Sequence, residues 1–385
     1  MFEFTLAATD GSARAGVWRL PHGDVPTPCF MPVGTQATVR TLSPRDLEAV
    51  GASMVLANTY HLHVRPGEAV VAKLGGLHRF MAWPKPLLTD SGGFQVFYLA
   101  GARKVSEEGV EFQSHVDGMW RHLSPERAVE IQWTLGADVA MAFDHVVPGQ
   151  TGHAAAEDAA ARTLRWLARS RDRFRDLARE APDRQTLVPI LQGGVFPDLR
   201  RAALAGLLDA GEAGGGESAG WRALAVGGLS VGEPKPKMEG VLADLATVLP
   251  PHLPRYLMGV GFPEDFVASV GRGMDLADCV APTRMGRNGA AFTDDGTINI
   301  RNAGYREDGA PLDAACDCET CTTFSRGYLR HLFAAEELLG LRLLSLHNVR
   351  YLIRLAARAR EAIVQGTFDG WSRAWLARYR SREQA

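Results

Sequence analysis

The stretch around Asp278 contains candidate catalytic and anion-binding residues. Asp278 opens a short apolar run that Pro282 stops, and Arg284 and Arg287 follow among glycines. A carboxylate beside a flexible loop with two cations predicts nucleophilic or acid/base chemistry on an anionic substrate. The pattern alone also fits an ordinary strand end with a surface loop, because short charged motifs match by chance.

A second group has the spacing of metal ligands. Cys316, Cys318 and Cys321 stand close together, and His347 follows. Thiolates at this spacing can surround a tetrahedral ion, and one histidine completes a Cys3His set. Four protein ligands leave no position open for water, so we expect a structural zinc ion. His347 is preferred to His331 because an amphipathic helix is expected to begin at His347.

The elements that position these residues are read from short apolar runs. Most of the runs are separated by helix-length stretches, which predicts buried parallel strands. Eight such runs predict an α/β fold, a (β/α)8 TIM barrel, with the zinc-binding subdomain inserted after strand 8. The expected strands are residues 29–33, 53–57, 86–89, 138–143, 187–191, 223–226, 256–260 and 277–281.

The residues that follow these strands gather on one rim, where such barrels carry their chemistry. They include three acids, two amides and several glycines: Gly34, Asn58, Asp90 to Gly93, Asp144, Gln192 to Gly194, Gly227, Gly228, residues 259–261 and the Asp278 segment. One acid alone could be merely solvated, but three acids on one rim favour a site.

A metal hydrolase is an alternative, because His61 and His63 follow the second strand. Paired histidines near a barrel rim can bind a catalytic metal. Such a site needs further ligands, however, and the fifth and sixth strands end in Gln192 and Gly228. Local hydrogen bonding or packing is therefore the preferred role of the two histidines.

Further elements complete the expected organisation. Residues 2–20 should form a hairpin, 111–122 a hairpin inserted after the third strand, and 211–220 a flexible surface loop. A helix should start at Ser124 and Pro125 and end near Gly136, and another should cover 154–181. Three parts follow: 1–290, the barrel with its N-terminal hairpin; 291–346, the zinc-binding subdomain; and 347–385, the last barrel helix and a basic tail.

Composition fits an ordinary globular protein of 385 residues, 46% hydrophobic and 22% charged. The net charge of −2 means that any affinity for nucleic acid must come from a local patch. No run approaches membrane-spanning length and the N-terminus lacks a basic, apolar leader, so we expect a cytoplasmic protein without membrane contact. Clustered cysteines in a reducing compartment indicate metal rather than disulfides.

Several motifs together resemble the bacterial tRNA-guanine transglycosylases. They are Thr89-Asp-Ser-Gly-Gly-Phe-Gln-Val96, Asn58-Thr-Tyr-His-Leu62 with Arg65-Pro-Gly67, Gln192-Gly-Gly194, Gly227-Gly-Leu-Ser-Val-Gly-Glu233, Tyr256-Leu-Met-Gly-Val-Gly261, Asp278-Cys279 with Pro282-Thr-Arg284, Gly286-Arg-Asn-Gly289 and the Cys3His set. The resemblance covers essentially the whole chain. It implies a zinc-containing barrel, usually a homodimer, without an organic cofactor.

The resemblance also implies an activity. Enzymes of this family exchange the wobble guanine of tRNAs for aspartate, asparagine, histidine and tyrosine with 7-aminomethyl-7-deazaguanine, in queuosine biosynthesis. By motif position, Asp278 resembles the nucleophile and Asp90 the general acid/base. The remaining implied positions are Asp144, Gln192, Gly228 and Leu229 for base recognition, Phe94 and Met258 for stacking, Asn58 and Ser91 in the pocket, and Thr283, Arg284 and Arg287 for the anticodon loop.

The physical chemistry suits these roles. A carboxylate can hold the ribosyl group by attacking the anomeric carbon, as in retaining glycosidases, and two inversions retain configuration. A second acid must manage the proton of the leaving base, and a nearby carboxylate raises its pKa. An Asp and a Gln match the amide and amino edges of a guanine-like base.

Two observations bear on the choice of base and one on the class of protein. Val146 stands where many bacterial members have a cysteine, which makes the selection among guanine, the aminomethyl base and queuine less certain. Val231 is larger than the glycine of queuine-using eukaryotic enzymes and favours the bacterial substrate. A non-catalytic RNA-binding subunit is the alternative, but Asp90, Asp278 and both arginines are present.

The C-terminal region is expected to help bind RNA, although a solvated basic helix fits it equally well. Its cations are Arg350, Arg354, Arg358, Arg373, Arg378, Arg380 and Arg382.

Overall fold

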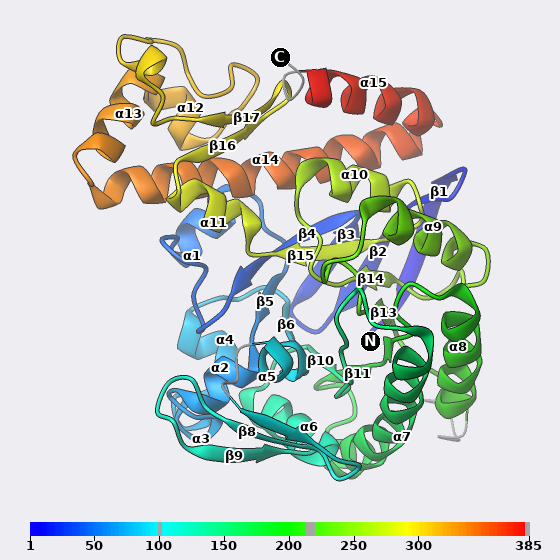
Figure 1. Ribbon diagram of the computed structural model, residues 1–385. Helices are drawn as coiled ribbons and strands as arrows, with labels where there is room; N and C mark the ends of the chain where they lie inside the picture. The colour runs from blue at the N-terminus through cyan, green and yellow to red at the C-terminus, as the bar shows by residue number, and fades with distance from the viewer. Residues whose placement is uncertain (99–101, 213–219, 382–385) are drawn as a thin grey trace.

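A computed structural model describes residues 1–98, 102–212 and 220–381 (Figure 1). Its centre is a parallel sheet whose strands run in the order β11-β10-β6-β5-β4-β15-β14-β13-β12. These strands are β4 (Cys29–Gly34), β5 (Val55–Ala57), β6 (Leu87–Thr89), β10 (Val139–Met141), β11 (Thr186–Val188), β12 (Ile190–Leu191), β13 (Leu224–Val226), β14 (Arg255–Leu257) and β15 (Leu276–Cys279). Each overlaps an expected strand, so the barrel prediction is confirmed.

The fifth expected strand appears as two segments, β11 and β12, on either side of Pro189. β11 pairs with β10 and β12 pairs with β13. Proline has no N–H to donate to a ladder, which explains the interruption. Nine segments therefore build a barrel of eight strands, with Pro189 at the junction.

Several expected strand boundaries were wrong by a few residues, and the last strand shows a physical reason. The last barrel strand ends at Cys279 rather than continuing to Ala281, because helix α11 (Ala281–Arg287) starts there with Pro282 in its first turn. Proline favours that position because its fixed φ suits a helix start. Asp278 thus lies on the strand, directly before a helix.

Helices and an inserted sheet surround the barrel. The predicted helix after Ser124 is α6 (Pro125–Leu135), and Ser124 caps it while Gly136 ends it in a left-handed conformation. The expected inserted hairpin is part of a three-stranded sheet, β7 (Arg103–Val105), β8 (Val110–Gln113) and β9 (Trp120–Leu123). The other helices are α1 (Pro44–Ala49), α2 (Thr59–Val64), α3 (Glu68–Lys73), α4 (Gly76–Met81), α5 (Gly93–Tyr98), α7 (His153–Ala178), α8 (Pro197–Glu212), α9 (Lys235–Ala246) and α10 (Pro263–Val270).

The N-terminal hairpin is confirmed as β1 (Phe4–Asp10) and β2 (Ala13–Leu20), and β3 (Gly23–Thr27) extends it to three strands. Most of the loop expected at 211–220 lies outside the described residues. Within them, no helix is long and apolar enough to cross a membrane.

The elements after α11 form a separate layer on one side of the barrel (Figure 1). They are β16 (Ala290–Thr293), β17 (Gly296–Asn299), a 3-10 turn (Ala303–Tyr305), α12 (Glu319–Thr323), α13 (Arg326–Ala334), α14 (Leu338–Val364) and α15 (Phe368–Ser381). Within this layer, α14 is the long helix that runs between the other elements and the barrel. The helix expected to begin at His347 begins instead at Leu338, so His347 lies within it.

The early start of α14 has a packing reason. Gly340 lies within its first turns, where a side chain would come within about 3 Å of Leu332 and Phe333 on α13. The close approach of the two helices needs glycine there, so a residue that weakens helix prediction is in fact required by the helix pair. The division of the chain at 290 and 346 stays a prediction, and α14 runs through the second boundary.

Candidate active site and metal site

Three carboxyl groups from the predicted rim are buried: Asp90 after β6, Asp144 after β10 and Asp278 on β15. Buried carboxyls are rare unless their oxygens are paired, because water no longer solvates the charge. In this protein each carboxyl accepts hydrogen bonds from neutral donors, and none of the three forms an ion pair among the described residues. Charge that is buried without a counter-ion is a mark of a functional site.

Asp90 is fixed by donors from two neighbouring segments. Its Oδ2 accepts from Asn58 Nδ2 at 2.5 Å and from Gln95 Nε2 at 2.9 Å, and its Oδ1 accepts from the backbone N–H of Thr59 at 2.7 Å. Burial raises the pKa of Asp90 to about 6, against the effect of these donors, and the charge of Asp278 raises it further. Asp90 can therefore gain or lose a proton near neutral pH.

Asp144 lies at the centre of a second polar chain. Ser91 Oγ donates to its Oδ1 at 2.9 Å, and Gln192 Nε2 donates to its Oδ2 at 2.6 Å. Burial raises the pKa of Asp144 to about 6. The structure thus brings together two predicted base-recognition residues, Asp144 and Gln192, and the predicted pocket residue Ser91, from three different strand ends.

Gly228 and Leu229 complete this corner of the site. Gly228 has φ +65°, and a Cβ there would lie 2.2 Å from Gln192 Oε1. Only glycine lets the backbone adopt this conformation while Gln192 lies against it. Leu229 is buried beside it, at 3% exposure. The backbone of β13's end is therefore within reach of anything that Gln192 binds.

Asp278 is oriented by one residue of β14 and one residue of the loop after it. Tyr256 Oη donates to its Oδ1 at 2.6 Å, and the backbone N–H of Gly259 donates to the same atom at 2.8 Å. Burial raises the pKa of Asp278, although both donors oppose the rise. Because the donors among the described residues converge on Oδ1, Oδ2 is the atom of this carboxylate that is left to react.

Asp278 and Asp90 influence each other's surroundings electrostatically. The charge of Asp278 raises the pKa of Asp90, and both carboxylates help burial to raise the pKa of the Tyr256 phenol far above its ordinary range. Two neighbouring carboxyls cannot both ionise easily, so one tends to hold a proton. This is the arrangement needed for one nucleophile and one general acid.

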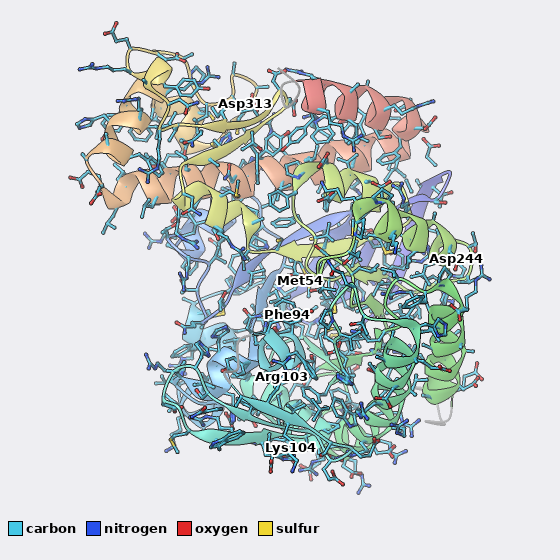
Figure 2. The ribbon with its side chains drawn as sticks, in the orientation of Figure 1. Met54, Phe94, Arg103, Lys104, Asp244 and Asp313 are labelled. Carbon is cyan, nitrogen blue, oxygen red and sulfur yellow. The ribbon has the colours of Figure 1, made fainter. Side chains whose placement is uncertain are left out.

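The two expected stacking residues lie at the edge of this site. Phe94 follows Gly93 on α5, is 46% exposed and stacks on Tyr98 with ring centroids 4.5 Å apart. Figure 2 places Phe94 in the middle of the barrel part of the molecule, with Arg103 and Lys104 of β7 to one side. Met258 is half-buried between Leu257 of β14 and Gly259, whose N–H holds Asp278.

Two of the three expected RNA contacts are open cations. Arg284 is exposed and Arg287 half-buried on α11, and neither has an ion pair among the described residues. Burial lowers the pKa of Arg287, and Arg40 and Arg284 lower it further, so three guanidinium groups lie near one another. The structure places Thr283 differently: it is buried, and its hydroxyl donates to the Val280 carbonyl at 3.3 Å.

The C-terminal arginines are not open in the same way. Arg350, Arg358, Arg373, Arg378 and Arg380 each pair with an acid, respectively Asp317, Asp294, Asp369, Asp295 and Glu264. Arg354 lies 3.9 Å from Asp313 and Asp317, and Arg382 falls outside the described residues. Their role in RNA binding stays a prediction, with less free positive charge than the sequence indicated.

The cysteines and the histidine of the expected metal site meet. Cys316, Cys318, Cys321 and His347 are buried, with ligand atoms all within 4.8 Å of one another. His347 Nδ1 lies 3.2 Å from Cys321 Sγ and 3.7 Å from Cys318 Sγ, while its Nε2 lies 2.7 Å from the Phe292 carbonyl. Donation of Nε2–H to that carbonyl frees Nδ1 for a metal, as second-shell carbonyls commonly do. The group can hold a metal ion.

The metal site is tied to the arginine helix through α14. Beside His347, Asn348 Nδ2 donates to the carbonyls of Pro282 and Ala290 at 3.0 and 2.9 Å. A side chain on Gly286 would lie 2.7 Å from the backbone N of Ser345. One stretch of α14 therefore holds α11 on one side and a metal ligand on the other.

Comparison with known proteins identifies this arrangement. The family model described as queuine tRNA-ribosyltransferase matches residues 9–381. The chain is 52% identical to the queuine tRNA-ribosyltransferase of Herpetosiphon aurantiacus over 99% of this chain and 93% of the relative. It is 49% identical to that of Oleidesulfovibrio alaskensis, over 100% and 96%. The chain belongs to the queuine tRNA-ribosyltransferase family. Its members are pentosyltransferases, and the chain is an enzyme of this class.

In this member of the family, His61 and His63 do not join a metal site among the described residues. His63 Nδ1 lies 2.9 Å from Glu68 Oε2, and His61 packs edge-on against Tyr60 and His115. The metal-hydrolase alternative therefore has no ligand set, and the preferred packing and hydrogen-bonding roles are those observed.

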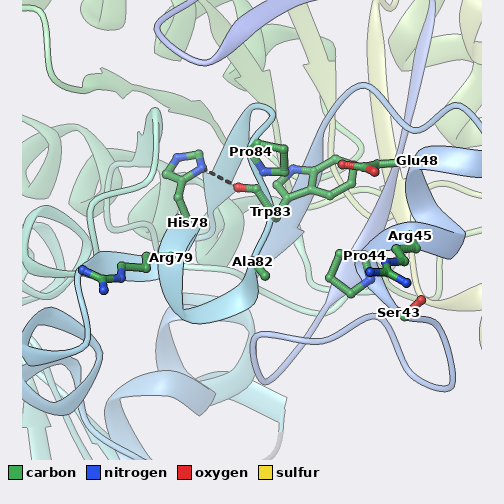
Figure 3. Close-up of a pocket in the computed structure, with 9 residues that line it drawn as sticks. All are labelled: Ser43, Pro44, Arg45, Glu48, His78, Arg79, Ala82, Trp83 and Pro84. Atoms are coloured by element: carbon green, nitrogen blue, oxygen red, sulfur yellow. Dashed lines mark hydrogen bonds between the residues drawn. The ribbon is translucent and has the colours of Figure 1, made fainter.

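A second possible ligand group lies away from the rim. Asp138, just before β10, contacts His22 Nδ1 at 2.7 Å and His78 Nε2 at 3.3 Å. The two imidazoles stack with centroids 3.6 Å apart. The lone pair of an imidazole nitrogen lies in the plane of its ring, so two stacked rings do not direct their lone pairs at one ion. His78 also lines a surface pocket with Trp83 and Pro84, where its Nδ1 contacts the Trp83 carbonyl (Figure 3).

The sequence analysis did not predict three residues of the candidate site: Tyr256, Gln95 and Gly259. All three stand inside motifs that carried the resemblance, Tyr256 and Gly259 in the 256–261 motif and Gln95 in the 89–96 motif. A tyrosine on an interior strand reads as core, and only the position of Asp278 reveals its hydroxyl as a hydrogen-bond donor to the site.

Proposed function

We propose that this enzyme exchanges the wobble guanine of GUN-anticodon tRNAs, those for Asp, Asn, His and Tyr, with 7-aminomethyl-7-deazaguanine. The observation that carries the proposal is the pair of buried carboxyls, Asp278 and Asp90, beside the Asp144–Gln192 pair. Names of the relatives specify tRNA as the ribosyl donor of those proteins. This local geometry supports the assignment of Asp278 as nucleophile, Asp90 as acid and the Asp144–Gln192 pair as the groups that recognise the base.

The first half-reaction forms a bond between a carboxylate oxygen of Asp278 and the anomeric carbon of the ribose. The glycosidic bond breaks, its electron pair leaves with guanine, and Asp90 gives that base a proton. In the second half, the incoming base loses a proton to Asp90 and attacks the same carbon, releasing Asp278. Two inversions return the original configuration. Tyr256 and Gly259 hold Oδ1 of Asp278, which aims Oδ2 at the ribose.

The base is read by Asp144, Gln192 and the backbone of Gly228 and Leu229, with Phe94 and Met258 on its faces. Asn58 and Ser91 support the site by donating to Asp90 and Asp144. Val231 supports the preference for the aminomethyl base, because its side chain is larger than the glycine of queuine-using eukaryotic enzymes. Val146 is buried and apolar, so it offers the base no hydrogen bond.

The anticodon loop is held by Arg284 and Arg287, with Thr283 beneath them in α11. Cationic side chains without intramolecular partners are free to release counterions when phosphates bind. The Cys3His group would hold zinc, which supplies structure only, because all four positions are filled by the protein. A cytoplasmic location follows from a tRNA substrate and stays a prediction.

The enzyme is further proposed to act as a homodimer. Large apolar side chains stand exposed on α13 and at the start of α14: Tyr328, Leu338 and Leu339 are 40%, 77% and 38% exposed. Tyr328 also stacks on Phe324, which presents a flat aromatic surface. Contiguous exposed apolar residues mark interaction surfaces, and a second copy of this chain is the occupant proposed here.

The deciding experiment uses unmodified tRNA with radiolabelled guanine and then with no acceptable incoming base. The wild-type enzyme should exchange guanine and, without a base, accumulate a covalent enzyme–RNA species that survives denaturing electrophoresis. Asp278→Asn should lose both exchange and the covalent species yet still bind tRNA. Asp90→Asn should block proton transfer while Asp278 keeps its nucleophilic oxygen.

Two outcomes would contradict the proposal. If the covalent species persists in Asp278→Asn and fails only in Asp90→Asn, the two acids have the opposite roles. If wild-type enzyme binds tRNA but exchanges no base, the chain is an RNA-binding subunit.

A further inference from the structure

Arg200 is a buried cation for which the mechanism above has no use. It lies on α8, has 0% exposure and forms no ion pair among the described residues. Burial lowers the pKa of its guanidinium to about 9, and the charge of Glu233 opposes this fall. Burying a guanidinium is costly unless its donors are satisfied, so the question is which acceptors it serves.

All of its hydrogen bonds go to backbone carbonyls. Nε donates to Gly194 at 2.7 Å, Nη1 to Leu191 at 3.1 Å and Nη2 to Gly227 at 2.8 Å. Leu191 and Gly194 flank the Gln192-Gly193 dipeptide, and Gly227 directly precedes Gly228. One planar fork therefore links the ends of β12 and β13, and a guanidinium holds such a geometry more rigidly than an ammonium.

The end of β12 carries the base-reading side chain, Gln192, and the end of β13 lies against it. A side chain on Gly227 would lie 2.8 Å from Gln192 Nε2, and one on Gly228 would lie 2.2 Å from Gln192 Oε1. Gln192 in turn donates to Asp144. The path runs from the guanidinium through two peptides to the amide of Gln192, and from there to the carboxylate that would read the base.

The backbone around Arg200 is fitted to its side chain. Gly193 has φ +143°, and a Cβ there would lie 2.7 Å from Arg200 Cγ. The stem of Arg200 thus fills the space beside Gly193, in a conformation that other residues rarely adopt. The arginine stem therefore packs against Gly193, the residue after Gln192, while the two glycines of β13's end lie against the Gln192 amide.

We propose that Arg200 is a positioning residue for the base pocket, which holds Gln192 and the Gly227–Gly228 peptide in register to bind a purine-like base. The proposal rests on the proposed function. Arg200 touches neither ribose nor RNA in this scheme, so it sets the affinity for the incoming base and not the attack by Asp278.

The test compares Arg200→Lys with a matched control at the opposite end of the barrel. Arg255 is also a buried arginine, at 5% exposure, and it donates to the carbonyls of Leu249 and Gly273. Arg255 is the first residue of β14, so it lies at the opposite end of its strand from the rim. Arg255→Lys therefore perturbs a similar buried network far from the base pocket.

Arg200→Lys should raise the KM for the incoming base about tenfold or more, since mispositioning one or two hydrogen bonds has that effect. The KM for tRNA should stay within about twofold. Arg255→Lys should lower the melting temperature similarly and leave both KM values unchanged. Gly193→Ala, which pushes on the same arginine stem, should reproduce the higher base KM and replaces Arg200→Lys if that variant does not fold.

An unchanged base KM in the folded variant, with thermal destabilisation like that of Arg255→Lys, would show that Arg200 is only structural. A base KM that rises equally in Arg255→Lys would also overturn the proposal. Failure of the proposed function is recognised separately, because then wild-type enzyme exchanges no guanine at all.

Discussion

At the scale of single residues, the site depends on carboxyls that are buried without cations. Asp144 shows the energetic consequence, because burial raises its pKa from 3.8 to about 6. A raised pKa means that the folded state favours the protonated form. The stability linked to that proton is fully present below the unfolded pKa and is lost as pH rises through about 6.

We therefore expect Asp144→Asn to be more stable than wild type by about 1–3 kcal/mol at pH 8. An amide fits the site, because its oxygen can accept from Gln192 and its NH2 can donate to Ser91 Oγ. The difference should shrink as pH falls from about 6 to 4. Urea unfolding at both pH values measures it, and a variant that is less stable at pH 8 would contradict the expectation.

The same proton governs base binding. A guanine-like edge offers N–H donors, which an ionised Asp144 accepts better than a neutral one. The KM for the base should therefore rise as pH falls below about 6, by about tenfold per pH unit at the limit. Initial rates across pH 5–8 with saturating tRNA check this. Asp144→Asn should have a high KM with this acidic limb absent.

At the scale of elements, α11 carries the open cations. Arg287→Ala should raise the KM for tRNA and lower the slope of log affinity against log salt by about 0.7–0.9. Arg179→Ala is the control, because Arg179 is an exposed arginine at the end of α7 that is paired with Asp176 and has no expected role in RNA binding. Equal slopes for Arg287→Ala and wild type would remove Arg287 from the RNA-binding surface.

The metal-binding elements give a second prediction at this scale. Cys318→Ala removes one of four ligands and should abolish metal binding, since closed sites of this kind contribute about 10–16 kcal/mol in small peptides. Elemental analysis after dialysis measures the metal, and limited proteolysis of residues 303–349 the loss of structure. Cys29→Ala, which removes a buried cysteine outside the group, should keep full metal content. Full metal in Cys318→Ala would refute the ligand assignment.

At the scale of the whole molecule, the dimer prediction can be separated from folding. Leu338→Glu should shift the mass in solution from dimer to monomer, because it places a charge on the proposed apolar contact. Val364→Glu changes another exposed apolar residue, 57% exposed against 77% for Leu338, at the other end of α14 and should remain dimeric. Analytical ultracentrifugation distinguishes them. A monomeric wild type at micromolar concentration would end the proposal.

Much of the architecture was predictable because buried parallel strands leave continuous apolar runs. All eight were found, and the errors lie at boundaries, where one proline interrupts a strand and another starts α11. The start of α14 was missed because Gly340 weakens the helix pattern, although tight packing against α13 requires it.

The acids, the amides and the metal ligands of the candidate site were also predictable, since their types are rare at strand ends or at such spacing. Residues that act through others were not. Tyr256 and Arg200 look like ordinary strand and helix residues, and their partners become visible only when distant segments meet. Thr283 shows a different limit: it directly precedes Arg284 and was expected to contact RNA by motif position, whereas its side chain is buried.

The sharing of α14 between the metal ligand and the arginine helix has a thermodynamic consequence. His347 and Asn348 are adjacent, and the first can bind the ion while the second holds the carbonyl of Pro282 in α11. If an occupied site steadies α11, the ion strengthens the grip on the anticodon loop. Reciprocity then requires that bound tRNA raise the affinity of the site for the ion by the same free energy. The tRNA-bound enzyme would therefore bind its metal ion more tightly than the free enzyme.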